Sequence, residues 1–144
     1  MIRHKSLVPL SREHHDALLL AQLLKKEVPD YKGMPTQIQE KAAYALALYH
    51  SKLKQHFKNE EIMLGKVKDV HEEITKLTDD IFREHQLLTA AFLSLSKPDN
   101  TIDELNALGL ALDEHIRKEE RVLFPMIQQY CSEEILNSFD FNSL

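Results

Sequence analysis

Residues that interrupt helices are scarce in this chain and fall in a few short stretches. The 144 residues include only three Gly and five Pro. Breaks are expected near 28–35, 65–70 and 96–100, which leaves four long segments at about 10–27, 36–64, 71–96 and 102–129, with a short fifth segment after Ser132. A chain with so few turn-forming residues is poorly suited to an all-β fold, so long helices are favoured.

Apolar residues in the long segments recur at helical spacing and do not alternate. In the second and fourth segments they are Leu46, Tyr49, Leu53, Phe57, Met63, Leu64, Leu105, Leu108, Leu112, Ile116 and Leu123. Four amphipathic helices joined by short loops predict an all-α fold, an antiparallel up-down-up-down four-helix bundle with a short C-terminal helical segment. We expect residues 1–144 to form one domain.

Local signals at the segment ends predict where the helices start and stop. Thr36 and Thr101 are each followed three residues later by Gln or Glu, as in a capping box, and Ser11 and Ser132 are expected to be N-caps. Pro125 lies near the end of the fourth segment and is expected to kink or end that helix.

Composition excludes several classes of protein and partner. The net charge is −5 and no block of Lys or Arg occurs, so a nucleic-acid partner is not expected. The single cysteine, Cys131, excludes a disulfide framework and a Cys-based zinc site within one chain. No apolar run approaches the roughly eighteen residues that cross a bilayer, and no apolar signal segment follows the N-terminus. We therefore expect a cytoplasmic protein with no membrane partner. The sequence identifies no protein partner.

Two of the eight histidines begin matching motifs in the two halves of the chain. His56 and Glu60, and His115 and Glu119, are four residues apart, so each pair shares one helix face, and each Glu is followed by another Glu. Arg-Glu-His also occurs twice, at 12–14 and 83–85. The halves therefore resemble two copies of one helical hairpin.

Six polar residues from these motifs interrupt stripes that are otherwise apolar and face the core. They are His14, His56, Glu60, His85, His115 and Glu119. A buried ionised carboxylate costs several kcal/mol or more unless it is paired or bound to metal, and no Lys or Arg falls on these stripes near the site. Imidazole and carboxylate without thiolate suit iron, manganese or zinc. With two Glu able to bridge, the six residues predict a dinuclear centre with two His for each metal.

These residues resemble the ligand motifs of the hemerythrin-like, or HHE cation-binding, family. The resemblance covers about residues 7–130, and its most specific piece is the run at 119–125, similar to the end of the family's last ligand helix. It implies two iron ions joined by an oxo or hydroxo bridge, and binding or sensing of O₂, nitric oxide or related small oxidants. Oxygen-carrying members have a further His where this chain has Ile81, and an Asp on the last helix, where Glu119 acts here. Six ligands in place of seven imply a more open, reactive or sensory site.

Several alternatives remain at this point. The same site could serve a di-iron oxidase or peroxidase, an iron–sulfur repair activity, or a zinc-stabilised interaction module, and no catalytic residue is assigned. His15 is the alternative to His14, and Tyr49 is a further candidate for the site. Glu61 and Glu120 lie about 100° from the ligand face and are expected mainly as surface charges.

Overall fold

The computed structural model describes residues 2–139, and within that range the secondary structure is helical, with no strand. The helices are α1 (Val8–Leu24), α2 (Ile38–Leu48), α3 (Lys54–Val67), α4 (Glu72–Leu93), α5 (Ile102–Lys118), α6 (Phe124–Tyr130) and α7 (Glu133–Leu136). The prediction of an all-α fold is thus confirmed for the part of the chain that is described.

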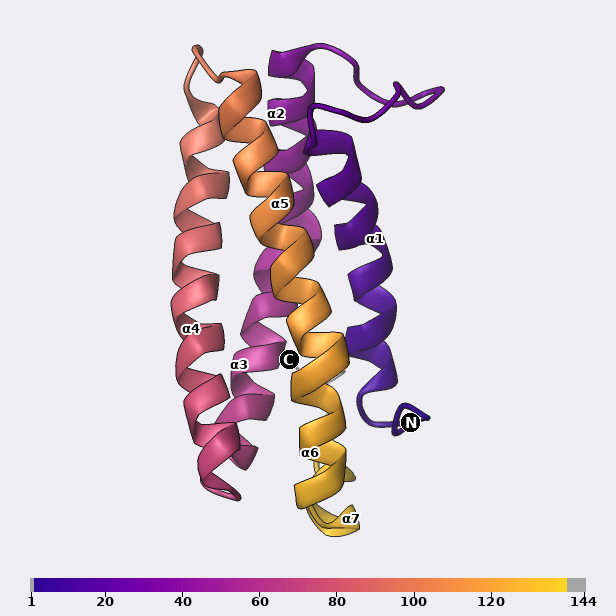
Figure 1. Ribbon diagram of the computed structural model, residues 1–144, viewed down its shortest axis with the longest axis vertical. Coiled ribbons are helices and arrows are strands. Elements are labelled where there is room, and N and C mark those ends of the chain that lie inside the picture. The colour runs from indigo at the N-terminus through magenta and orange to yellow at the C-terminus, as the bar shows by residue number, and fades with distance from the viewer. Residues whose placement is uncertain (1, 140–144) are drawn as a thin grey trace.

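Four helical runs lie side by side along the long axis of the molecule (Figure 1). Short π-helical segments, Tyr49–Leu53 and Glu119–Leu123, join α2 to α3 and α5 to α6. The runs are therefore α1, α2–α3, α4 and α5–α6. Figure 1 shows the connections between them alternating between the two ends of the molecule, and α1 packs most extensively along α5.

The core consists of two apolar clusters, one toward each end of the bundle as it is drawn in Figure 1. The upper cluster includes Ala17, Leu20, Leu24, Ala45, Tyr49, Leu53, Phe57, Leu88, Phe92, Leu105, Leu108, Leu112 and Ile116. The lower cluster includes Leu7, Leu10, Met63, Leu64, Val67, Ile74, Ile81, Leu123, Phe124 and Ile127.

A polar layer separates these clusters. On α1, for example, His14 lies between Leu10 of the lower cluster and Ala17 of the upper one. The α4 run repeats this order, because His85 follows Ile81 and precedes the next upper-cluster residue of that helix. Apolar packing above and below therefore shields the layer from water.

The sequence indicated that Pro125 would kink or end the helix, but the helix does not end there. The run continues through Pro125 to Tyr130, and the turn before the proline is widened into the π segment, where the Phe124 N–H donates to the Glu119 carbonyl. Proline lacks an N–H and its ring crowds the preceding turn, so a wider turn removes the conflict. Leu123, one of the apolar residues at helical spacing, is buried there, whereas its neighbour Val122 is 42% exposed.

The predicted helix starts are half confirmed. Thr101 and Ser132 cap α5 and α7, accepting from the N–H groups three residues later at 3.1 and 3.2 Å. Ser11 is not an N-cap, because α1 begins at Val8. Thr36 is not one either, because the N-cap of α2 is Gln37, whose side chain makes no capping hydrogen bond. A proline in the first turn of α1 presets the helical backbone angle, so that helix can begin before the serine.

The break expected at residues 65–70 is shorter than predicted. Gly65 lies inside α3, which continues to Val67, and α4 starts at Glu72. His71 caps α4, since its Nδ1 accepts from the Glu73 N–H at 3.1 Å. An N-cap role for His is not among the usual Ser, Thr, Asp and Asn signals, so spacing and residue type did not reveal it. Within residues 2–139, no helix is long and apolar enough to cross a membrane.

Gly109 lies where α5 packs closely against α1. A Cβ built there would lie 2.7 Å from the Ala21 carbonyl oxygen and 3.1 Å from the Leu24 Cβ, whereas one at Gly65 meets nothing within 4 Å. We expect Gly109→Ala to lower the free energy of unfolding by about 1–3 kcal/mol through overpacking.

The matched control, Gly65→Ala, is expected to raise the free energy of unfolding by up to about 1 kcal/mol, because Ala favours the helix and Gly65 is exposed. Urea unfolding of the two variants and the parent chain measures both effects. Equal effects of the two substitutions would contradict close packing of α1 and α5.

Candidate metal centre

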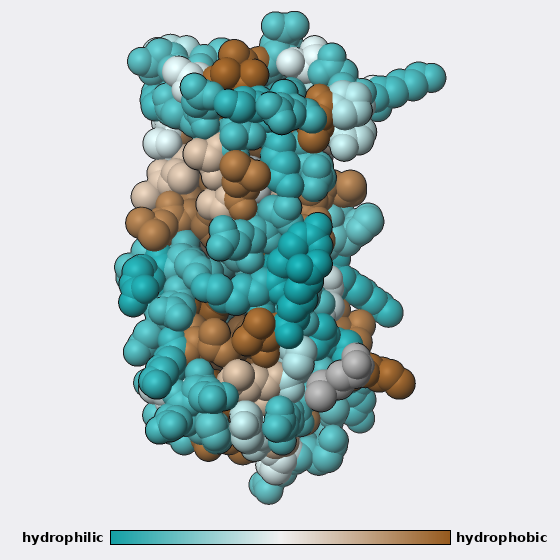
Figure 2. Space-filling model, in the orientation of Figure 1, coloured by the Kyte–Doolittle hydropathy of each residue, from teal (hydrophilic) through white to brown (hydrophobic). Residues whose placement is uncertain are grey.

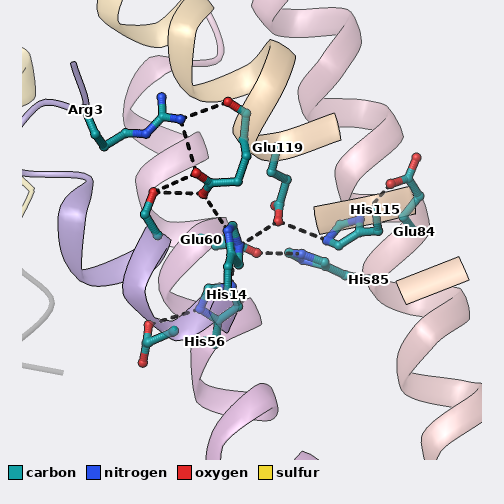
Figure 3. A network of polar contacts seen from close by, with 11 residues as sticks. Arg3, His14, His56, Glu60, Glu84, His85, His115 and Glu119 are labelled. Atoms are coloured by element: carbon teal, nitrogen blue, oxygen red, sulfur yellow. Dashed lines mark hydrogen bonds and ion pairs between the residues drawn. The ribbon is translucent and has the colours of Figure 1, made fainter. Parts of the chain in front are cut away.

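The six residues singled out in the sequence lie together in the polar layer (Figure 3). α1 contributes His14, α3 contributes His56 and Glu60, α4 contributes His85, α5 contributes His115, and Glu119 begins the π segment that follows. All six are almost fully buried, with exposed fractions between 0% and 3%. Every helical run of the bundle therefore contributes to one enclosed cluster.

The six side chains form two groups of four that share both carboxylates. One group is His14, His56, Glu60 and Glu119, and the other is Glu60, His85, His115 and Glu119. In each group, one potential ligand atom per residue lies within 4.8 Å of the others. Two imidazoles on each side of a shared pair of carboxylates is the arrangement that a dinuclear centre requires.

Glu60 lies between the two groups and contacts both. Its Oε2 is 3.2 Å from His14 Nε2 and 3.1 Å from His56 Nε2, and its Oε1 is 3.1 Å from His85 Nε2. The two oxygens of one carboxylate therefore face different pairs of imidazoles. A bridging carboxylate presents its oxygens in the same way.

Glu119 also faces both groups but makes no hydrogen bond. Its Oε1 is 3.1 Å from His14 Nε2 and 3.3 Å from His115 Nε2, yet both of its oxygens lack a hydrogen-bond partner. His56 Nε2 and His115 Nε2 are likewise buried without a hydrogen-bond partner. Buried polar atoms are almost always hydrogen-bonded in native proteins, so four such atoms without a hydrogen bond, converging on one place, indicate a site for a cation.

Each imidazole is held from behind by a second glutamate, and we call these four residues the outer glutamates. Each histidine donates from Nδ1 to one glutamate on another helical run. The pairs are His14 with Glu120 at 2.7 Å, His56 with Glu13 at 3.0 Å, His85 with Glu61 at 2.8 Å and His115 with Glu84 at 2.7 Å. A proton fixed on Nδ1 turns Nε2 toward the centre, as in metal sites where a carboxylate orients the ligating histidine.

The outer glutamates correct one expectation and reveal residues that sequence reasoning missed. Glu61 and Glu120 are not merely surface charges, because each bonds a histidine of another helix. Glu13 and Glu84 were visible only as neighbours of His14 and His85 in the repeated Arg-Glu-His motif. The internal repeat was the sequence signal that could have identified them, because Glu13 is equivalent to Glu84 and Glu61 is equivalent to Glu120 in the two halves.

Further contacts hold two of the outer glutamates. Glu120 accepts from Ser11 Oγ at 2.8 Å and from Arg3 at 3.1 Å, and Figure 3 shows Arg3 at the edge of this network. Glu84 pairs with Lys118 in the same way. These contacts restrain carboxylates that in turn restrain the imidazoles.

Neighbouring carboxylates raise the pKa of three of the imidazoles. Burial lowers the pKa of His14, but Glu119 and other nearby carboxylates outweigh it and raise that pKa to about 12. Burial likewise opposes charge on His56 and His85, whereas Glu60 and the outer glutamates raise both pKa values to about 9. Without metal, protons therefore occupy the cluster.

The two shared carboxylates differ in their protonation. Burial raises the pKa of Glu60, but the charges and hydrogen bonds of His56 and the other imidazoles outweigh it and hold that pKa well below its usual range. For Glu119, burial and the negative charge of Glu60 together raise the pKa. Like charges that share a small buried volume disfavour double ionisation, so the pair accommodates two negative charges only with added positive charge.

The remaining candidates lie outside the cluster. His15 is exposed, and Tyr49 is buried in the upper cluster, where its ring stacks on Phe92 at 5.2 Å. Neither belongs to either group of four, so the geometry favours His14. Ile81, at the position where oxygen carriers have a further His, is fully buried among apolar neighbours.

Comparison with protein families agrees with this geometry. A family model described as the hemerythrin HHE cation binding domain matches residues 6–127, and the chain therefore belongs to that family. Comparisons with curated proteins and with solved structures gave no match. The donors present, imidazole nitrogen and carboxylate oxygen with several unpaired atoms, fit a bound cation.

Proposed function

We propose that this chain is a non-haem di-iron protein that binds or senses O₂, nitric oxide or related small oxidants in the bundle core. In this proposal His14 and His56 hold one iron, His85 and His115 hold the other, and Glu60 and Glu119 are shared by both. The division of the six residues into two groups of four around common carboxylates supports it. The resemblance to oxygen-binding members of the family supports iron over manganese or zinc.

The observation that carries the proposal is the setting of Glu119, whose only ion pairs among the described residues are with the imidazoles of His14 and His115. Both carboxylate oxygens are fully buried and accept no hydrogen bond. An uncompensated buried charge is strongly destabilising, and in residues 2–139 no Lys or Arg forms an ion pair with Glu60 or Glu119. Two divalent ions would supply the positive charge and displace the protons that the imidazoles otherwise hold.

The chain's own residues define what such a centre can do. Iron in this ligand set supplies the capacity to bind and exchange electrons with small oxidants. The outer glutamates keep each Nδ1 protonated and each Nε2 directed inward, and the two apolar clusters exclude bulk water. Ile81 adds no ligand, so the His85–His115 side retains fewer protein donors than in oxygen carriers.

The proposal also extends to the fold and the setting. We infer the up-down-up-down topology of a hemerythrin-like bundle, which the alternating connections in Figure 1 support. A single domain over residues 1–144 and a cytoplasmic location remain predictions. An oxidase or peroxidase activity would require turnover of peroxide or O₂ with a reductant, and no residue beyond the metal ligands is assigned to catalysis.

Metal content of ligand variants tests the assignment of the six residues. Glu60→Ala and Glu119→Ala are each expected to lose the dinuclear site, because each removes a ligand shared by both ions. His14→Ala is expected to lower occupancy, whereas the matched control, His15→Ala, should retain about two ions per chain because its side chain is exposed. Elemental analysis after anaerobic loading with ferrous iron gives the result.

Glu120→Gln provides a graded test of the outer glutamates. Loss of its carboxylate charge should weaken metal affinity by about 10–100-fold while leaving the site filled at excess iron. Metal loss from His15→Ala equal to that from His14→Ala would show that the helix face is wrongly assigned. Full occupancy of Glu60→Ala would show that the carboxylate is not shared.

Nitric oxide binding tests the function itself. Protein loaded anaerobically with ferrous iron is titrated with nitric oxide, and with O₂ in a parallel sample, while the optical spectrum is recorded. We expect a saturable change of the visible spectrum in the iron-loaded chain and none in the zinc-loaded chain. An iron-loaded protein whose spectrum responds to neither gas nor to peroxide would contradict the proposed function and favour the zinc-stabilised interaction module.

A further inference from the structure

An apolar cavity opens between α4 and α5 and reaches the metal-binding layer. Its volume is about 370 Å³, and His115 and Glu84 lie at its inner end. Leu88 and Leu108 form a buried floor, while the small exposed residue Ala111 leaves the mouth open. Figure 2 shows apolar residues gathered over α4 and α5 in the upper part of the visible face.

The size of the cavity suggests an occupant larger than a diatomic gas. A water molecule occupies about 30 Å³ of liquid, and a dry engineered cavity of about 150 Å³ holds benzene. At about 370 Å³, this cavity falls in the range of sites for small organic ligands, which begins at about 300 Å³. A molecule of two or three aromatic rings or a short branched hydrocarbon matches that volume.

The charges around the cavity favour an uncharged occupant. Glu84 accepts from His115 Nδ1 and pairs with Lys118, so its charge is already compensated. At the other end, Glu104 pairs with Lys97. Both carboxylates that line the cavity therefore have cationic partners, and apart from Ser94 the wall between them is aliphatic. A charged ligand would compete with these ion pairs, whereas an apolar one would not.

The related position in the other half of the chain has a different character. Asp16 and Leu87 occupy equivalent positions, three residues after Glu13 and Glu84 respectively. Lys52 and Ala111 are also equivalent, since each lies four residues before a ligand histidine, His56 or His115. In the first half Lys52 Nζ pairs with Asp16 at 2.9 Å, and both residues line a cavity of about 310 Å³. The repeat thus yields an ion pair on one side of the bundle and an apolar opening on the other.

We propose that the α4–α5 cavity is a binding site for an uncharged, apolar organic molecule that contacts His115. The bound molecule lies along Leu88, Ala107 and Leu108, and its inner end meets the imidazole. The further step, that this molecule is a substrate or effector of the centre, rests on the proposed function, because His115 is one of the proposed metal ligands. Binding itself does not depend on metal.

Titration with a neutral naphthalene fluorophore, N-phenyl-1-naphthylamine, tests the site in the full chain, both chelator-treated and zinc-loaded. We expect saturable binding of one probe per chain. Ala107→Phe and Ala111→Phe fill the cavity from exposed helix positions, so the fold should tolerate them, and each should weaken binding at least tenfold. Ala43→Phe places the same side chain at an exposed position of α2 and should leave binding unchanged.

Side-chain NMR of the histidines provides the second readout. The probe should shift the imidazole resonances of His115 and leave those of His56, its counterpart in the other half, in place. No saturable binding to the parent chain, undiminished binding to both cavity variants, or equal shifts of the two histidines would overturn the proposal. Because the chelator-treated chain is tested as well, failure to load iron would contradict the proposed function without affecting this result.

Discussion

The structure depends on two buried carboxylates that share one small volume. Glu60 and Glu119 are fully excluded from solvent, and burial together with the charge of Glu60 raises the pKa of Glu119. Such a pair would destabilise an ordinary core. Here the four imidazoles converge on it, the outer glutamates hold those imidazoles from behind, and an apolar cluster lies on either side. The layered core is consistent with a site built for cations.

The repeat relates the two halves of the site, but not their surroundings. Each half provides a histidine on its first helix and a histidine and glutamate on its second, and each outer glutamate bonds a histidine of a different helix. Beyond this layer the halves diverge, as Lys52 and Ala111 show. The differences therefore lie where small molecules would approach, while the ligand positions are alike.

Spacing along single helices allowed much of this structure to be predicted. The four-residue interval placed His56 with Glu60 and His115 with Glu119, and apolar neighbours distinguished His14 from His15. What depends on contacts between helices could not be read in the same way. The bonds of Glu61 and Glu120 follow from packing across the bundle, and so does the cavity. The π turn before Pro125 lets the helix continue through the proline, which a fixed period of 3.6 does not anticipate.

Anomalous X-ray diffraction from crystals of the iron-loaded chain tests the central claim most directly. Data collected at the iron absorption edge locate each ion independently of the protein ligands. The account predicts two anomalous peaks in the polar layer, one beside His14 and His56 and one beside His85 and His115, with Glu60 and Glu119 between them. A single peak, or peaks outside these two groups, would contradict a dinuclear centre formed by the six residues.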